Sequence, residues 1–165
     1  RRKGMVILFM QYLIIFLISM VPLIELRGAI PYAIGFKLPL LPSYIICILG
    51  NMLPVPFIFL FARKILVWGS DKKYIGGFFN WCLKKGEKGG KKLQEKAGRG
   101  LYVALFLFVG IPLPGTGAWT GTLAASFLDM GFKKSVIAVL GGVLLAGIIM
   151  GIASAGVFTA IFSFA

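Results

Sequence analysis

Three long runs of apolar residues divide the chain, and they cover residues 5–24, 41–68 and 135–165. As α-helices these runs would rise about 30, 42 and 46 Å, against a hydrocarbon core of about 30 Å. Each is long enough to cross a bilayer. No small-residue cleavage pattern follows the first run, so we expect mature membrane protein rather than a signal peptide. The pattern predicts an all-α integral membrane protein.

A fourth apolar segment, residues 101–111, is too short to cross. It would rise about 16 Å before the sequence PLPGTG, whose prolines and glycines break a helix. Lipid cannot hydrogen-bond the backbone groups that such a break frees, so broken helices occur at membrane depth only inside protein or beside a wet cavity. We therefore expect a re-entrant helical hairpin, which enters the membrane, turns near the midplane and leaves on the same side.

The first half of the chain contains a comparable interruption. The sequence VPLIELRGAIPYAIG ends the first apolar run, and Pro22, Gly28, Pro31 and Gly35 in it surround two charged residues. The same reasoning predicts a second re-entrant hairpin here, so each half of the chain would contribute one.

The two interrupted regions also align with each other. Residues 21–36 pair with residues 111–127, with VPL opposite IPL and Gly28 opposite Gly117, and further on CILGNML pairs with AVLGGVL. Together with the two hairpins this predicts an inverted repeat whose hairpin tips meet near the midplane. The alternative is that residues 5–24 cross alone, which would place the N-terminus in the cytoplasm and leave the symmetry partial.

Basic residues are concentrated between the two halves. Residues 63–99 carry 11 basic and 3 acidic side chains, and the positive-inside rule places such a segment in the cytoplasm. Tyr74, Phe78 and Cys82 recur there at helical spacing, which predicts an interfacial helix on an anionic leaflet; the alternative is a segment that only sets orientation. The predicted domains are a first membrane repeat (1–68), a basic cytoplasmic helix and linker (69–99) and a second membrane repeat (100–165).

Composition excludes whole classes of protein. With 59% hydrophobic residues, 14% charged residues and a mean hydropathy of +0.94, the chain does not fit a soluble domain. The net charge of +13 must lie outside the hydrocarbon, where it can meet lipid phosphates. Histidine is absent, and Cys47 and Cys82 lie in unrelated settings. We expect no enzyme, no metal, no cofactor and no nucleic-acid partner.

Two charged residues stand inside the first interruption. Charges at membrane depth cost several kcal/mol on insertion scales, so Glu25 and Arg27 mark a functional site, whereas Lys37 and Asp129 are expected nearer an interface. A carboxyl group in a low-dielectric site holds its proton more strongly. We therefore expect Glu25 to couple transport to the proton gradient. The alternative is that Glu25 and Arg27 only neutralise each other at a helix break.

The second interruption, PLPGTGAWTGT, predicts an anion site. Thr116 is expected to cap a half-helix that continues to Ala125, and the free amides at such a start attract an anion. Arg27 adds a planar guanidinium suited to phosphate or carboxylate. The alternative for the glycines and threonines is close helix packing. The predicted substrate-binding residues are Arg27, Gly28, Pro31, Pro112, Pro114, Gly115, Thr116, Gly117, Trp119 and Thr120.

Three motifs carry a resemblance to a known family. IELRGAIP, LGNMLPVPFI and FVGIPLPGTGAWTG resemble the small multi-drug export proteins of bacteria and archaea, over nearly the whole chain. That family is similar in layout to the DedA-like superfamily. The resemblance implies two re-entrant hairpins and proton-dependent transport of a lipid carrier, with an acidic residue and an arginine, here Glu25 and Arg27, at the hairpins. It also implies the inner membrane of a prokaryote.

These observations lead to one main prediction of function and two alternatives. The main prediction is a proton-coupled transporter or flippase for an amphipathic substrate, an anionic lipid phosphate, with membrane lipids and a second copy of the chain as possible partners. The first alternative is an exporter of cationic compounds, in which Trp119, Tyr32 and Phe36 surround Glu25 while Arg27 turns away. The second is a holin-like or scaffold membrane protein that moves no substrate.

Overall fold

A computed structural model describes residues 2–22, 24–74, 76–77, 80–81, 84, 100–113 and 115–163. The described residues form helices and contain no strand, which confirms the all-α prediction. The helices are α1 (Arg2–Met20), α2 (Glu25–Gly35), α3 (Leu40–Met52), α4 (Pro54–Ser70), α6 (Gly100–Gly110), α7 (Ala118–Phe127) and α8 (Phe132–Ser163). Most of the predicted interfacial helix, including Phe78 and Cys82, lies outside the described residues.

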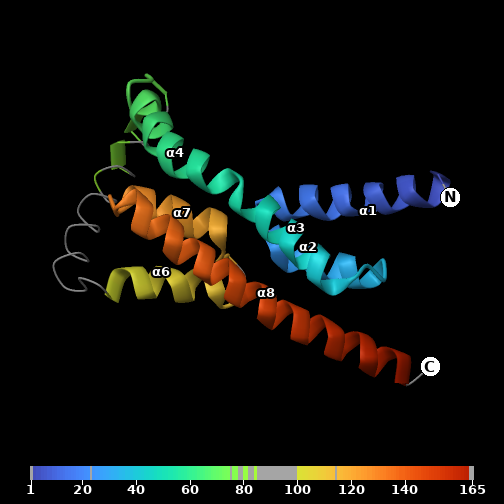
Figure 1. The fold of residues 1–165 in the computed structure, drawn as a ribbon. Coiled ribbons are helices and arrows are strands. Elements are labelled where there is room, and N and C mark those ends of the chain that lie inside the picture. Colours follow the sequence, from blue (N-terminus) through green and yellow to red (C-terminus); the bar gives the residue numbers. More distant parts are fainter. Residues whose placement is uncertain are drawn as a thin grey trace.

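Each half of the chain builds a helical hairpin followed by a long helical segment. In the first half α1 packs against α2 and α3, and in the second half α6 packs against α7 and α8. Figure 1 shows α1 and α6 running toward each other from opposite ends of the molecule, so that the turns of the two hairpins lie near its middle. The two ends of the chain lie at the same end of the molecule in that view. Contacts of α2 with α8 and of α4 with α7 join the halves.

Among the described residues, two segments are long and apolar enough to cross a membrane, and they are Leu40–Ser70 and Phe132–Val157. The first is bent at Leu53, where α3 ends and Pro54 begins α4, because proline has no backbone N–H to continue the helical bonds. Residues 5–24, expected either as half of a hairpin or as a segment that crosses alone, form a shorter apolar helix. The apolar part of α1 is Gly4–Met20, and the chain turns directly after it.

The turn after each hairpin has the same backbone geometry in both halves. The Leu38 amide donates to the Ala33 carbonyl over 3.0 Å, and the Met130 amide donates to Ala125 over 3.0 Å. The residues just before these two donors, Lys37 and Asp129, both have left-handed backbones, with φ of 57° and 53°. The two turns thus share one local geometry, while the inverted repeat stays a prediction.

Glycines allow helices to cross closely in both halves. A Cβ on Gly50 would overlap Ser19 of α1 and lie 2.6 Å from the Phe16 carbonyl oxygen. A Cβ on Gly142 would lie 2.8 Å from the Phe106 carbonyl oxygen of α6, and a Cβ on Gly141 would lie 3.0 Å from the Phe106 ring.

The two glycines that the sequence alignment pairs stand in different local settings. Gly28 lies inside α2, whereas Gly117 directly precedes α7. The loop before α7 is longer than the loop before α2.

Large apolar side chains cover the outside of the helices. Leu41 of α3, Phe57 of α4 and Ile152 of α8 expose 71%, 59% and 71% of their surface. Exposed apolar area of this extent is unfavourable in water and favourable in hydrocarbon. Together with the two long apolar segments, it supports the membrane location.

Candidate functional site at the turn of the second hairpin

The carboxylate of Glu25 binds the start of α7. It is 3% exposed, its Oε2 accepts from the Ala118 amide over 3.0 Å, and its Oε1 accepts from the Trp119 amide over 2.9 Å. These amides have no partner within their own helix, and the positive end of a helix dipole favours a negative charge. Glu25 itself has a left-handed backbone, with φ of 51°. Such a conformation costs about 1 kcal/mol or more for a residue with a side chain, and Lys37 and Asp129 adopt it as well.

The guanidinium of Arg27 binds the other side of the interruption between α6 and α7, at the end of α6. Its Nη1 donates to the carbonyls of Leu113 (2.7 Å) and Thr116 (2.8 Å). Its Nη2 donates toward the carbonyls of Val109 (3.1 Å) and Ile111 (3.2 Å) and toward Thr116 Oγ1 (2.9 Å). The carbonyls that follow a helix carry the negative end of its dipole, so a cation is favourable there.

Glu25 and Arg27 therefore supply partners for both ends of the interruption between α6 and α7. Residues two positions apart on a helix point in different directions, which lets the carboxylate reach α7 while the guanidinium reaches the end of α6. The amides at the start of α7 are occupied in this structure by the protein's own Glu25 carboxylate, and an anion site for a substrate stays a prediction.

Thr116 does not cap α7 as expected. The N-cap residue is Gly117, with φ of 140° and no side-chain cap bond. The Thr116 hydroxyl instead lies within hydrogen-bond distance of the carbonyls of Ile111 (3.0 Å) and Leu113 (2.9 Å), and it accepts from Arg27. The physical reason is that Glu25 already occupies the amides that a capping hydroxyl would bind.

Gly117 allows the close approach of Glu25. A Cβ at this position would overlap Glu25 Oε2 and would lie 2.8 Å from Glu25 Cδ. Its φ of 140° is also a conformation that residues with a side chain rarely adopt. Gly115 has a positive φ of 81° as well, but a Cβ there would meet nothing within 4 Å.

The structure places the other predicted residues at different distances from this centre. The Trp119 indole donates to the Met20 carbonyl over 3.0 Å, which ties α7 to the end of α1, and Thr120 Oγ1 lies 3.4 Å from the Gly117 carbonyl. Gly28 faces Ile24 and α1 rather than the second hairpin. Pro31 lies inside α2, and Pro112 lies in the turn after α6. Pro114 lies outside the described residues.

The aromatic cage expected for a cation exporter is only partly assembled. Tyr32 and Phe36 pair with each other, with ring centroids 6.2 Å apart, and Tyr32 is 55% exposed. Trp119 reaches the Glu25 carboxylate through its backbone amide, whereas its indole N–H binds Met20. Arg27 points at the second hairpin.

Sequence reasoning missed the backbone carbonyls that bind Arg27, and it missed Asn51 and Ser135 as buried polar side chains. Among the described residues, three buried side-chain atoms have no hydrogen-bond partner, namely Asn51 Oδ1, Thr122 Oγ1 and Ser135 Oγ. No sequence signal singles out Asn51 or Ser135, because other polar residues stand in the same helices. Among the described residues no group of three or more Cys, Asp or Glu side chains is placed to hold a metal.

A comparison with protein families gives a match over residues 25–149 to the family described as "Putative small multi-drug export protein". This chain belongs to that family. The match begins at Glu25 and includes both charged residues and the whole second hairpin. A search of curated proteins and a search of solved structures each give no match. The similarity of this chain to the DedA-like superfamily stays a prediction.

An apolar groove lies beside the site. The groove lies between α4 and α7, has a volume of about 400 Å³ and is lined by Trp119 with Phe57, Ile58, Phe61, Ala62, Ile65, Leu123 and Phe127. Trp119 thus belongs both to the groove and, through its amide, to the Glu25 site.

Proposed function

We propose that the protein is a proton-coupled membrane transporter for an amphipathic anion, with a lipid phosphate as the substrate class. The observation that carries this proposal is the buried carboxylate of Glu25 on the first two amides of α7. An internal anion held on a helix N-terminus can be replaced by a substrate anion that binds the same amides.

The proton acts on Glu25. When Glu25 takes up a proton it loses its negative charge, and its two charge-assisted hydrogen bonds to Ala118 and Trp119 weaken. The amides then become available to a phosphate group. Arg27 lies on the other side of the turn and would exchange some of its carbonyl partners for phosphate oxygens. Proton and anion would therefore bind together and move in the same direction.

The proposal includes a membrane arrangement. The hairpins α1–α2 and α6–α7 would be re-entrant from opposite sides, as two inverted repeats, with α3–α4 and α8 as the crossing segments. Two observations support this arrangement. The helices α1 and α6 run in opposite directions (Figure 1), and the turns after α2 and α7 have the same backbone hydrogen bond. The basic segment after α4 would lie in the cytoplasm of a prokaryotic cell, below the inner membrane.

A second candidate function is export of cationic compounds, and two observations favour it. The family description names multi-drug export, and the aromatic groove of Trp119, Phe57 and Phe61 adjoins the Glu25 site. A cation would compete with the proton for Glu25, so protons and substrate would move in opposite directions. The direction of coupling therefore separates the two functions.

The test uses purified protein in liposomes with an imposed proton gradient. The probes are phosphatidic acid with a fluorescent nitrobenzoxadiazole label and the cation ethidium. We expect the gradient to accelerate movement of the labelled phosphatidic acid in wild type and in Asp71→Asn, which removes an exposed carboxylate at the end of α4. Glu25→Gln keeps the shape of the side chain but cannot ionise, so it should lose this acceleration while its thermal unfolding remains cooperative.

Two results would overturn the proposal. Glu25-dependent exchange of ethidium against protons, without movement of the lipid, would establish the cation exporter. If wild-type protein moves neither probe under a gradient, the transporter proposal fails and the scaffold alternative takes its place.

A further inference from the structure

A second groove lies between α6 and α8, apart from the residues of the hairpin site. It has a volume of about 850 Å³, and its walls come from α6 (Tyr102, Val103 and Phe106) and from α8 (Lys134, Ile137, Ala138 and Gly141). None of the hydrogen bonds of Glu25 or Arg27 involves these residues. The groove therefore needs an explanation of its own.

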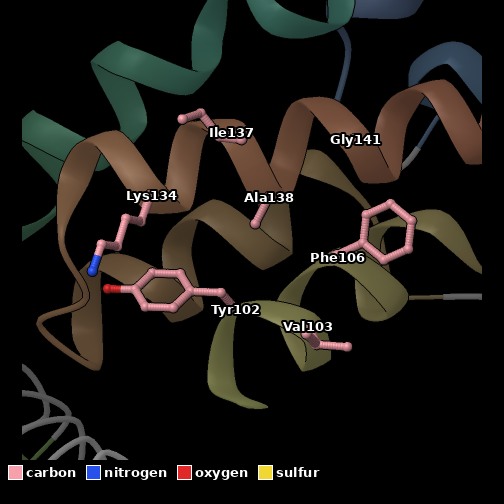
Figure 2. Close-up of a pocket in the computed structure, with 7 residues that line it drawn as sticks. All are labelled: Tyr102, Val103, Phe106, Lys134, Ile137, Ala138 and Gly141. Carbon is pink, nitrogen blue, oxygen red and sulfur yellow. The ribbon is translucent and has the colours of Figure 1, made fainter. Parts of the chain in front are cut away.

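The polar atoms of this groove gather at one end. Figure 2 shows the Lys134 ammonium and the Tyr102 hydroxyl close to each other, with Phe106 and Gly141 toward the other end. The Lys134 Nζ lies 5.7 Å from the centre of the Tyr102 ring. The Tyr102 oxygen accepts from the Gly131 amide over 3.2 Å, so its own proton remains available for donation. The groove thus offers donors at one end and hydrocarbon along the rest.

The electrostatics at the donor end call for an anion. Lys133 and Lys134 both stand in the first turn of α8, which contains no acidic residue. Cations at a helix N-terminus are unfavourable because the helix dipole is positive there. The nearest acid in sequence, Asp129, lines a different groove together with Lys64. A negative group bound beside Lys134 would offset both the lysines and the dipole.

We propose that this groove binds an anionic phospholipid as a resident ligand. The phosphate would lie at Lys134 Nζ and the Tyr102 hydroxyl, and an acyl chain would follow Val103, Phe106 and Ile137 along the groove. The donor end lies at the same end of the molecule as the C-terminus of α4, where the basic segment begins. The lipid therefore belongs to the leaflet that contacts this basic segment. This binding is independent of the proposed transport.

The test measures lipid binding to the whole purified protein by native mass spectrometry in detergent. Dioleoyl phosphatidylglycerol and dioleoyl phosphatidylcholine are titrated separately as probes. Lys134→Gln should weaken binding of phosphatidylglycerol about fivefold, which is the usual effect of one lysine at an anionic surface. The matched control is Lys133→Gln, which removes the same charge from the same helical turn but not from the groove, and it should change binding less than twofold.

A third variant tests the apolar part. Val103 is 57% exposed and lines the groove, so Val103→Trp fills the groove without disturbing buried packing, and it should weaken binding of both lipids. Equal effects of the two lysine substitutions would show diffuse surface attraction and overturn the proposal. Unchanged phosphatidylglycerol binding in Val103→Trp would overturn it as well. Since transport is not measured, failure here leaves the proposed function untouched.

Discussion

The carboxylate of Glu25 occupies the space that a side chain on Gly117 would need. A Cβ built on Gly117 overlaps Oε2 of Glu25 and lies 2.8 Å from both Cδ and Oε1. The start of α7 can therefore accept the Glu25 carboxylate only if residue 117 is glycine. This contact fixes the turn of the second hairpin against the first.

Gly117→Ala should destabilise the protein and displace Glu25 from α7. The new methyl group strains a backbone with φ of 140°, which costs about 1–3 kcal/mol, and loss of the charge-assisted hydrogen bonds adds about 1.5–3 kcal/mol. The measurement is the melting temperature in detergent. Gly115→Ala is the control, because its φ of 81° is also positive but its surroundings are open. Equal losses in the two variants would show that backbone strain alone matters.

Arg27→Lys should also lower stability clearly, although the charge is retained. The five acceptors around the guanidinium cannot all be reached by the three N–H groups of an ammonium, so some of these exposed or partly buried acceptors lose a partner, at a cost of about 1 kcal/mol each. Unfolding in denaturant measures this loss. A melting temperature equal to wild type would show that a positive charge is sufficient.

Substitution of both charges tests whether Glu25 and Arg27 act as a simple ion pair. They bind opposite ends of the interruption, so each of the substitutions Glu25→Gln and Arg27→Gln leaves its own partners unsatisfied, and the double variant should be less stable than either single variant. A double-mutant cycle of unfolding free energies measures the difference. A double variant that is more stable than either single variant would contradict the separate roles and favour mutual neutralisation.

The sequence predicted the interruptions before α2 and α7, because proline, glycine and run length act locally, but it did not predict the bend at Leu53 within residues 41–68. It identified PLPGTG as a turn, and it singled out Glu25 and Arg27 because charges are costly in a membrane. It could not predict that their partners are backbone groups far along the chain. Thr116 was expected to cap α7 on the basis of residue type, and the closer Glu25 carboxylate takes that place.

Gly50→Ala should weaken the crossing of α1 and α3. The added methyl group overlaps Ser19 and approaches the Phe16 carbonyl oxygen to 2.6 Å, so the helices must separate. We expect a loss of about 1–3 kcal/mol, typical of overpacking. Gly151→Ala in α8 is the control, since a Cβ there meets nothing within 4 Å, and it should leave the melting temperature nearly unchanged. Similar melting temperatures for both variants would contradict close packing at Gly50.

The proposed inverted repeat predicts that the turn after α2 and the turn after α7 face opposite sides of the membrane. Single cysteines replace Lys37 after α2 or Asp129 after α7, in a chain with Cys47 and Cys82 changed to serine. A maleimide that cannot cross membranes should label the Lys37 position from outside intact cells and the Asp129 position only after permeabilisation. Tyr74→Cys, at a residue that is 98% exposed in the basic segment, is the cytoplasmic control. Labelling of both turns from one side would contradict the inverted repeat.

The hydrogen bonds that join Glu25 and Arg27 to the second hairpin have a consequence for biosynthesis. Glu25 and Arg27 leave the ribosome 82 to 94 residues before the groups that bind them. At a translation rate of about 5–20 residues per second, they wait on the order of 10 s with no partner from the second hairpin. Two unpaired charges are costly in hydrocarbon, so the tip of α2 should remain in a hydrated place until α6 and α7 arrive. The first hairpin to be synthesised would therefore be the last to reach its final depth.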